Sequence, residues 1–304
     1  MTGSPAWIAG AYAALEPGLT AERAERDARE LYAVLAQPGA FDGLELPYRS
    51  SLPDLALVTG ASFTRHVITA IPGTMQRLAK DCSFGLASRN DEGRKAALNF
   101  TREVVRASRD LEGAVVAIEI HSAPSDCADP SAFAASLETL MSERAESDPE
   151  FVIEHCDAAG MPFPGEKRFL SLEEEVHLAK ETGVGIALNW GRSALETRNP
   201  TTALEHVQHA AQAGVLRAFM ASGAGAGTPV YGPEWADAHL PHKDHEPSSM
   251  MTDDALSSCA AAAGGNLLYT GVKIQTPRGF TAYERSRVLA RVAEPMRSVF
   301  SRTG

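Results

Sequence analysis

The ionisable residues that could do chemistry in this sequence stand at the ends of short apolar runs. Lys273 lies within the otherwise apolar residues 269–274, and lysines are rarely buried without a partner or a task. A buried ammonium can tune proton transfer with a neighbouring carboxylate, neutralise an oxyanion or enolate, or form a Schiff base with a carbonyl. We therefore predict that Lys273 is catalytic. The alternative is a solvent-facing charge at the end of the run.

Glu154 and His155 end another apolar run and are adjacent in the chain. In an extended strand, neighbouring side chains point to opposite faces, so only one of the two would face a shared site. We predict that Glu154, or else His155, is a catalytic general base. For Glu154 the structural alternative is a buried carboxylate paired with Lys273.

A further group of polar residues could orient a substrate. Arg192 suits bidentate capture of a carboxylate or phosphate, and an ion pair with Glu196, four residues on, is its structural alternative. Trp190 could stack on a sugar ring or cover an apolar core. The predicted substrate-binding residues are Glu45, His121, Asn189, Trp190, Arg192 and Ser222.

The residues 223–251 form the longest insertion. Its glycine-rich start, residues 222–227, could bind an anion through backbone N–H groups, but the hinge of a mobile lid fits better because no lysine accompanies it. Its second half is dense in residue types that ligate metals. Asp237 and His239 could swing into the site as the loop closes, and we predict them as ligands of a divalent metal ion. The alternative is a set of solvated lid residues.

Eight short apolar runs position these residues, and a helix-periodic segment follows each run. Successive apolar residues suit strands that are covered on both faces. Helix signals include a capping box at Ser171, a C-terminal cap at Gly183, and the pairs Asp129-Pro130 and Asn199-Pro200. The runs are residues 7–12, 43–47, 66–71, 115–121, 151–155, 185–190, 216–221 and 267–274.

Strand–helix alternation predicts a parallel sheet with right-handed crossovers. Eight units favour closure into one α/β domain over residues 1–304, a (β/α)8 TIM barrel with an extended, lid-like loop after strand seven. The rival is an open doubly wound sheet, which often begins with a glycine-rich turn, and residues 11–15 contain no such turn. We expect no nucleotide cofactor. In a barrel, the polar residues above meet at the C-terminal ends of the strands.

Composition narrows the functional classes. The net charge of −11 argues against binding a nucleic-acid backbone and against anionic membrane surfaces. The four cysteines are far apart and form no CxxC pair, so we expect reduced thiols. No stretch reaches the roughly 18 uncharged apolar residues of a membrane span. We expect a cytoplasmic protein with a small-molecule substrate and leave a homodimer open.

The segments 41–45 (FDGLE), 118–122 (IEIHS) and 152–155 (VIEH) resemble those of the xylose-isomerase-like barrels. That superfamily holds sugar (phosphate) isomerases, epimerases and endonuclease-IV-type phosphodiesterases. More narrowly, residues 188–196 (LNWGRSALE) and 235–241 (WADAHLP) resemble an uncharacterised bacterial family within it.

This sequence departs from the metal site that the resemblance implies. Ketose epimerases of the superfamily hold a divalent ion with Glu, Asp, His and Glu from strands five to eight. Glu154 fits the first position, whereas Asn189 stands at the second and Met220 or Ser222 at the third. The fourth position offers Lys273 or Gln275, and a lysine there would repel the ion.

Together these features predict an isomerase or epimerase that removes a proton next to the carbonyl of a small sugar-like or hydroxy-carbonyl substrate. Lys273, or a metal held partly by Asp237 and His239, would stabilise the enolate. The first alternative is a lyase or metal-dependent hydrolase on the same barrel. The second is a non-catalytic barrel that binds a sugar or metabolite.

Overall fold

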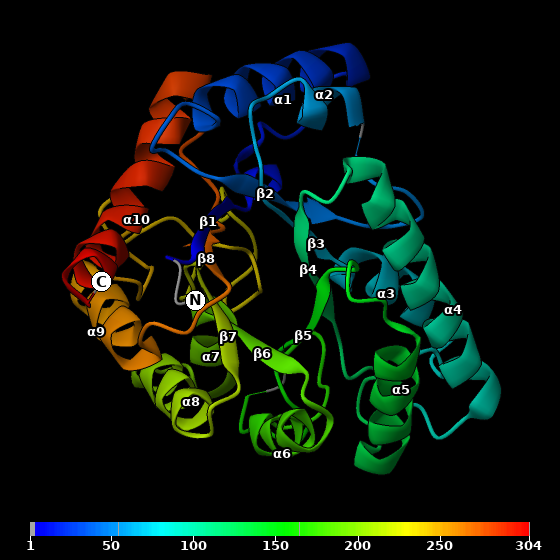
Figure 1. The fold of residues 1–304 in the computed structure, drawn as a ribbon. Coiled ribbons are helices and arrows are strands. Elements are labelled where there is room, and N and C mark those ends of the chain that lie inside the picture. Colours follow the sequence, from blue (N-terminus) through cyan, green and yellow to red (C-terminus); the bar gives the residue numbers. More distant parts are fainter. Residues whose placement is uncertain (1–3, 54, 164, 304) are drawn as a thin grey trace.

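Eight short parallel strands close into a barrel, and helices surround it (Figure 1). The computed structural model describes residues 4–53, 55–163 and 165–303. Each strand pairs with the next, and β8 pairs with β1 to close the sheet. The predicted single-domain (β/α)8 barrel is confirmed. The strands are β1 (Ala6–Ala9), β2 (Gly43–Pro47), β3 (His66–Thr69), β4 (Val115–Ile120), β5 (Glu150–Glu154), β6 (Gly185–Asn189), β7 (Leu216–Ala221) and β8 (Tyr269–Val272).

Each of the eight predicted runs overlaps a strand, and most strands are shorter than the runs; β1 and β5 begin one residue before the predicted run. β2 and β7 match their predicted bounds. β1 ends at Ala9 because the chain then turns into the short 3-10 helix η1 (Ala11–Ala14), which takes Tyr12 out of the strand. β8 ends at Val272, so Lys273 is the first residue beyond it. The polar residues of interest therefore lie where the strands give way to loops.

The barrel interior follows the two-residue alternation of the strands. Its apolar layer packs mostly small side chains: Ala6, Ile8, Val67, Ala117, Val152, Ala187, Ala218, Met220 and Tyr269. Two residues further along the same strand faces come Glu119, Glu154 and Asn189, all almost fully buried. The interior is thus apolar at its centre and polar at the carboxyl end.

The helices pack around the outside of the barrel (Figure 1), and most bury one face, whereas α7 is buried along nearly its whole length. They are α1 (Ala21–Leu35), α2 (Leu55–Thr59), α3 (Ile71–Leu78), α4 (Asp91–Ser108), the short 3-10 helix η2 (Arg109–Leu111), α5 (Pro130–Glu143), α6 (Leu172–Thr182), α7 (Trp190–Thr197), α8 (Thr201–Gln212), α9 (Asp253–Ala263) and α10 (Ala282–Thr303). Among the described residues, none of these helices has the length and apolar character that a membrane span requires.

The predicted helix ends are observed. Ser171 caps α6 in a complete capping box with Glu174, and Gly183 ends this helix in the left-handed conformation at φ 75°. Asp129 is the N-cap of α5, directly before Pro130, and its side chain accepts a hydrogen bond from the Ala132 N–H. The Asn199-Pro200 start is the exception: Asn199 accepts a hydrogen bond from the Thr201 N–H at 3.0 Å, but Pro200 is the N-cap and α8 begins at Thr201, one residue later than predicted. Local sequence signals therefore set where these helices start and stop.

Residues 223–251, which we call the lid segment, lie folded onto the carboxyl end of the barrel. Isolated antiparallel bridges join Gly223 to Leu240 and Gly225 to Ser249. The Gln275 amide donates to the carbonyls of Tyr231 and Ala238 at 2.7 and 2.6 Å. A Cβ at Gly223 would lie 2.2 Å from a carbonyl oxygen, so this glycine permits close backbone packing.

The Ser171 cap gives a test of how local signals contribute to stability. Its hydroxyl oxygen accepts the Glu174 N–H at 3.3 Å, and its own N–H donates to the Glu174 carboxylate at 2.9 Å. Ser171→Ala leaves one helix N–H without its side-chain acceptor, and we expect it to lower the free energy of unfolding by about 1 kcal/mol. Urea titration checks this. Ser142→Ala, at an exposed position within α5, is the control, and an equal loss in both variants would contradict the role of the cap.

Candidate active site

Lys273 is buried between two carboxylates at the carboxyl end of the barrel. Its Nζ lies 2.6 Å from Glu45 Oε1 and 3.4 Å from Glu154 Oε1, and its side chain is 1% exposed. Gly10 makes room for it, because a Cβ at residue 10 would lie 2.7 Å from Lys273 Cβ. The solvent-facing alternative for Lys273 is therefore wrong. A buried ammonium with two carboxylate partners can stay charged.

Glu154 is held by two cations and two hydrogen-bond donors. Arg192 Nη1 and Lys273 Nζ contact Oε1 at 2.5 and 3.4 Å. His121 Nε2 and Thr69 Oγ1 contact Oε2 at 2.8 and 3.2 Å. Burial alone would raise the pKa of Glu154, but the charges of Arg192 and Lys273 outweigh it and hold this pKa well below its usual value. An ionised carboxylate of such low basicity is a weak proton acceptor, which counts against the predicted role of Glu154 as the base.

The pKa values of Glu45 and Glu119 are shifted in the opposite direction to that of Glu154. Burial raises the pKa of Glu45, although the Lys273 charge opposes the shift. Burial, together with the charges of Glu154 and Glu45, raises the pKa of Glu119 well above its usual value, which favours the protonated form of this carboxyl group. Within the described part of the chain, Oε2 of each residue is buried and has no hydrogen-bond partner.

Two tyrosines hold the other oxygens of these carboxyl groups. The Tyr12 hydroxyl donates to Glu45 Oε1 at 3.1 Å, and the Tyr269 hydroxyl donates to Glu119 Oε1 at 2.6 Å. Neither tyrosine, nor Glu119, was among the predicted site residues. The alternation of Glu119 and His121 along one strand was the available signal for Glu119. No signal in the sequence marked Tyr12 as a site residue, because this residue was predicted to lie within a strand.

The three carboxylates Glu45, Glu119 and Glu154 form a cluster that could hold a metal ion, with ligand oxygens all within 4.8 Å of one another. Such oxygens are the ligands that Mg²⁺ and Mn²⁺ prefer. The Lys273 ammonium, however, already contacts two of the three carboxylates, and a divalent ion beside it would be repelled. As folded, these residues therefore fit an ammonium and do not fit an added metal ion.

The lid segment contributes Asp237 and His239 to the same end of the barrel. Asp237 Oδ2 accepts from Arg192 Nε at 2.9 Å and from Lys167 Nζ at 2.8 Å. Burial would raise the pKa of Asp237, but these two cations hold it well below its usual value. Arg192 therefore pairs with Glu154 and Asp237, and the predicted alternative of a pair with Glu196 is wrong.

His239 and Ser222 meet beside this pair, with Ser222 Oγ 2.9 Å from His239 Nδ1. The same nitrogen lies 3.3 Å from Asp237 Oδ1. Burial lowers the pKa of His239 to about 3, so the ring is neutral. The structure thus brings the predicted pair Asp237 and His239 together. Arg192 and Lys167 already neutralise Asp237, which disfavours a metal ion there.

The other predicted substrate contacts separate into two groups. Asn189 Oδ1 caps α7 through the N–H groups of Gly191 and Arg192, while its Nδ2 has no partner among the described residues. His121 keeps a similarly unpartnered Nδ1 in that part of the chain, and burial lowers its pKa. Trp190, by contrast, is fully buried in the apolar layer that also contains the inner faces of the helices. It covers the core and does not join the site.

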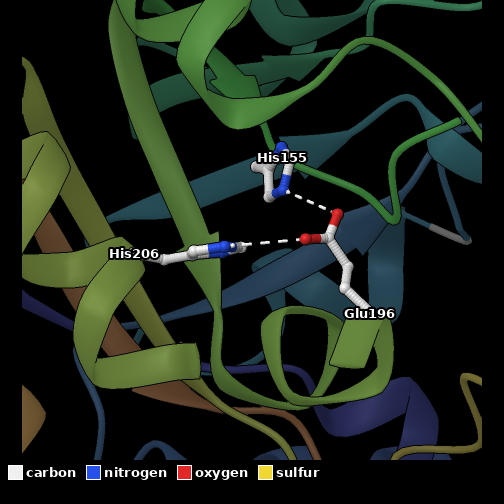
Figure 2. Close-up of side chains that lie close together, drawn as sticks. All are labelled: His155, Glu196 and His206. Carbon is white, nitrogen blue, oxygen red and sulfur yellow. Dashed lines mark ion pairs between the residues drawn. The ribbon is translucent and has the colours of Figure 1, made fainter. Parts of the chain in front are cut away.

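His155 lies on the other side of β5 from Glu154, as the alternation predicts. Its Nδ1 lies 2.6 Å from Glu175 Oε2 on α6, and its Nε2 lies 3.3 Å from Glu196 Oε1 on α7. Glu196 Oε2 lies 3.5 Å from His206 Nε2 on α8 (Figure 2). Burial would lower the pKa of His155, but Glu175 and Glu196 raise it to about 10. His155 therefore belongs to a separate cluster outside the barrel.

Comparisons with known proteins agree with this architecture. An uncharacterised Salmonella typhimurium protein, STM3670, is 34% identical over 271 residues, which cover 83% of this chain and 84% of that protein. A sugar phosphate isomerase/epimerase from Parabacteroides distasonis has a TM-score of 0.59 at 13% identity, over 97% of this chain and 94% of its own. A xylose isomerase-like TIM barrel protein from Mycobacterium smegmatis, in complex with magnesium, has a TM-score of 0.56 at 9% identity, over 98% of both chains.

At these identities the solved structures show a shared fold, and they confirm the predicted resemblance to xylose-isomerase-like barrels. The family described as a domain of unknown function (DUF4862) matches residues 8–288, which is most of the chain. The predicted membership of an uncharacterised family is thus confirmed, and the chain belongs to the DUF4862 family.

Proposed function

We propose that the protein is an isomerase or epimerase that removes a proton next to the carbonyl of a small hydroxy-carbonyl compound, such as a sugar. The observation that carries this proposal is the buried Lys273 ammonium, which contacts Glu45 and Glu154 beside the neutral Glu119. Enolisation needs a base, a group that stabilises a developing oxyanion, and an acid. The name of the Parabacteroides distasonis relative supports the substrate class.

Glu45 is the base in this proposal, in place of Glu154 or His155. Its Oε2 is buried and has no partner within the described residues, so it is free to accept a proton. Its raised pKa makes it a stronger base than Glu154. His155 faces away from the barrel interior and is bound by Glu175, which removes it from the reacting atoms.

Lys273 and Glu119 complete the reaction. As Glu45 takes the proton from carbon, negative charge moves onto the carbonyl oxygen, where the Lys273 ammonium stabilises it. The neutral Glu119 can then give its proton to that oxygen. Transfer of the proton from Glu45 to the other carbon, while the neighbouring hydroxyl gives its proton to Glu119 and becomes the new carbonyl, gives an isomer. Transfer to the opposite face of the first carbon, after the enediol has turned in the site and while the enol oxygen returns its proton to Glu119, gives an epimer. Carboxyl groups whose surroundings push their pKa values apart are typical of such acid–base pairs.

Glu154 positions the cations in this proposal, since it contacts both Lys273 and Arg192. The unpartnered nitrogens of Asn189 and His121 would contact substrate hydroxyl groups. Arg192 would bind an acidic group of the substrate. The residues of the site are nearly all fully buried, so a substrate enters only after the lid segment moves and Asp237 separates from Arg192.

A metal-dependent lyase or hydrolase is the second candidate. The free Oε2 atoms of Glu45 and Glu119 favour it, and so does the magnesium named for the Mycobacterium smegmatis relative. It requires Lys273 to leave the carboxylates. The non-catalytic barrel would keep the same contacts and show no turnover.

Replacing Lys273 by methionine tests the central role of the ammonium. The variant removes the group that stabilises the enolate, and we expect exchange of the substrate's α-proton with solvent to slow by about 100-fold or more. Proton NMR in D2O measures this exchange across aldoses, ketoses and their phosphates without knowledge of the product. The loss of a buried partner should also lower the free energy of unfolding by about 3–5 kcal/mol.

Lys180→Met is the matched control, because Lys180 is an exposed residue on α6. It should exchange and unfold like the native protein. Exchange at the native rate in folded Lys273→Met would show that Lys273 is not catalytic. Native protein that binds a sugar without any exchange would instead favour the non-catalytic barrel.

The pH dependence distinguishes the base from the acid. Glu45 must be ionised, so kcat/KM should fall as the pH drops through its raised pKa, above the ordinary carboxyl range. Glu119 must be protonated, so kcat/KM should also fall as the pH rises through its own, strongly raised pKa. Glu119→Gln keeps a neutral side chain and should remove the alkaline limb while the acidic limb stays. An unchanged alkaline limb in this variant would assign that limb to another group.

Chelation separates the two candidate reactions. If Lys273 supplies the positive charge, treatment with EDTA should leave α-proton exchange intact at temperatures well below unfolding. Loss of exchange on chelation, with recovery on adding Mg²⁺ or Mn²⁺, would support the metal-dependent alternative and count against the ammonium mechanism.

A further inference from the structure

We propose that His155, Glu196 and His206 form a zinc site outside the barrel, between β5, α7 and α8. Figure 2 shows the Glu196 carboxylate facing both imidazole rings, with one oxygen toward each. The three residues offer ligand atoms within 4.8 Å of one another. This site is separate from the carboxylates inside the barrel and does not depend on the proposed function.

The spacing of the ligand atoms suits a tetrahedral ion. His155 Nε2 lies 3.3 Å from Glu196 Oε1, and His206 Nε2 lies 3.5 Å from Glu196 Oε2. Zinc bonds to nitrogen and oxygen of about 2.0–2.1 Å place tetrahedral ligand atoms about 3.3–3.4 Å apart. Two imidazoles and a carboxylate are a zinc ligand set, whereas Mg²⁺ and Ca²⁺ prefer oxygen alone.

Both imidazole rings are oriented by a second partner. His155 Nδ1 lies 2.6 Å from Glu175 Oε2, and His206 Nδ1 lies 3.1 Å from Ser193 Oγ. Metal-bound histidines nearly always engage the other ring nitrogen in this way, which fixes the ring and turns the free nitrogen toward the ion. Here both Nε2 atoms are turned toward Glu196.

His155 supplies an independent indication. Its side chain is 1% exposed, and within the described chain its Nε2 makes no well-aligned hydrogen bond, although it lies 3.3 Å from Glu196 Oε1. A buried polar atom of this kind needs a partner that the fold leaves room for. A bound ion would displace the proton that the raised pKa of His155 leaves on this ring. The backbone N–H of Ala158 donates to Glu196 Oε1 at 2.7 Å and fixes the carboxylate.

His206 gives the site an opening, because its side chain is 16% exposed while the other two ligands are buried. An ion can therefore enter from this side, and a water molecule can occupy the fourth position. The bound ion would join three elements. One of these elements, β5, ends at Glu154, which is next to His155. Another, α7, carries Arg192 one helical turn before Glu196.

The test is a zinc titration of metal-free protein against a chromophoric chelator, with thermal unfolding in parallel. The native protein should bind one equivalent of zinc tightly and unfold at a higher temperature with zinc than without. His206→Ala should lose the equivalent and the thermal shift. Ser193→Ala removes only the hydroxyl that orients His206 and should weaken zinc binding about 10- to 100-fold.

His209→Ala is the matched control, because His209 is exposed on the same helix, α8, and should bind zinc like the native chain. Glu119→Gln should also keep the equivalent, which separates this site from the barrel interior. Circular dichroism confirms folding, and His206→Gln replaces His206→Ala if the latter unfolds. The proposal is overturned if native protein binds no zinc, if the folded His206 variant binds it as tightly as native, or if Glu119→Gln abolishes binding.

Discussion

The contact of the Lys273 ammonium with Glu45 and Glu154 is the interaction on which the carboxyl end of the barrel depends. It joins β2, β5 and the end of β8, elements far apart in the chain. Removing three charged groups from water is costly, and only close mutual contacts offset that cost. Small residues make these contacts reachable, because a Cβ at Gly10 would displace the lysine itself. The ammonium also takes the place that a metal ion would occupy in a ring of carboxylates.

The sequence predicted the fold well because the barrel repeats one local pattern. Strand runs, helix caps and the opposite orientation of Glu154 and His155 all follow from the periodicity of neighbouring residues. Strand ends were less well predicted, as Tyr12 shows, because a strand stops where its neighbours stop pairing. Glu45, Ser222 and Lys273 were predicted as site residues because a polar residue in or just after an apolar run is conspicuous.

Chemical roles were harder to predict because a pKa depends on neighbours that are distant in sequence. Glu154 was the natural candidate for the base, yet Arg192 and Lys273 depress its pKa. For Glu119, burial and the charges of Glu154 and Glu45 outweigh the opposing charge of Lys273 and raise its pKa. The structural alternative for Arg192 was a pair with Glu196, four residues away, whereas the side chain contacts Asp237 from the lid segment. No local pattern contains that information.

The attachment of the lid segment has a mechanical consequence. Gln275 holds this segment through three hydrogen bonds, two from its side-chain amide and one from its backbone N–H to the His239 carbonyl at 2.7 Å. It stands only two residues after Lys273, on the same stretch of chain. Any displacement of the lid segment that keeps these bonds pulls on the backbone that carries the ammonium. Movement of the lid segment and the position of the Lys273 ammonium are therefore mechanically coupled through Gln275.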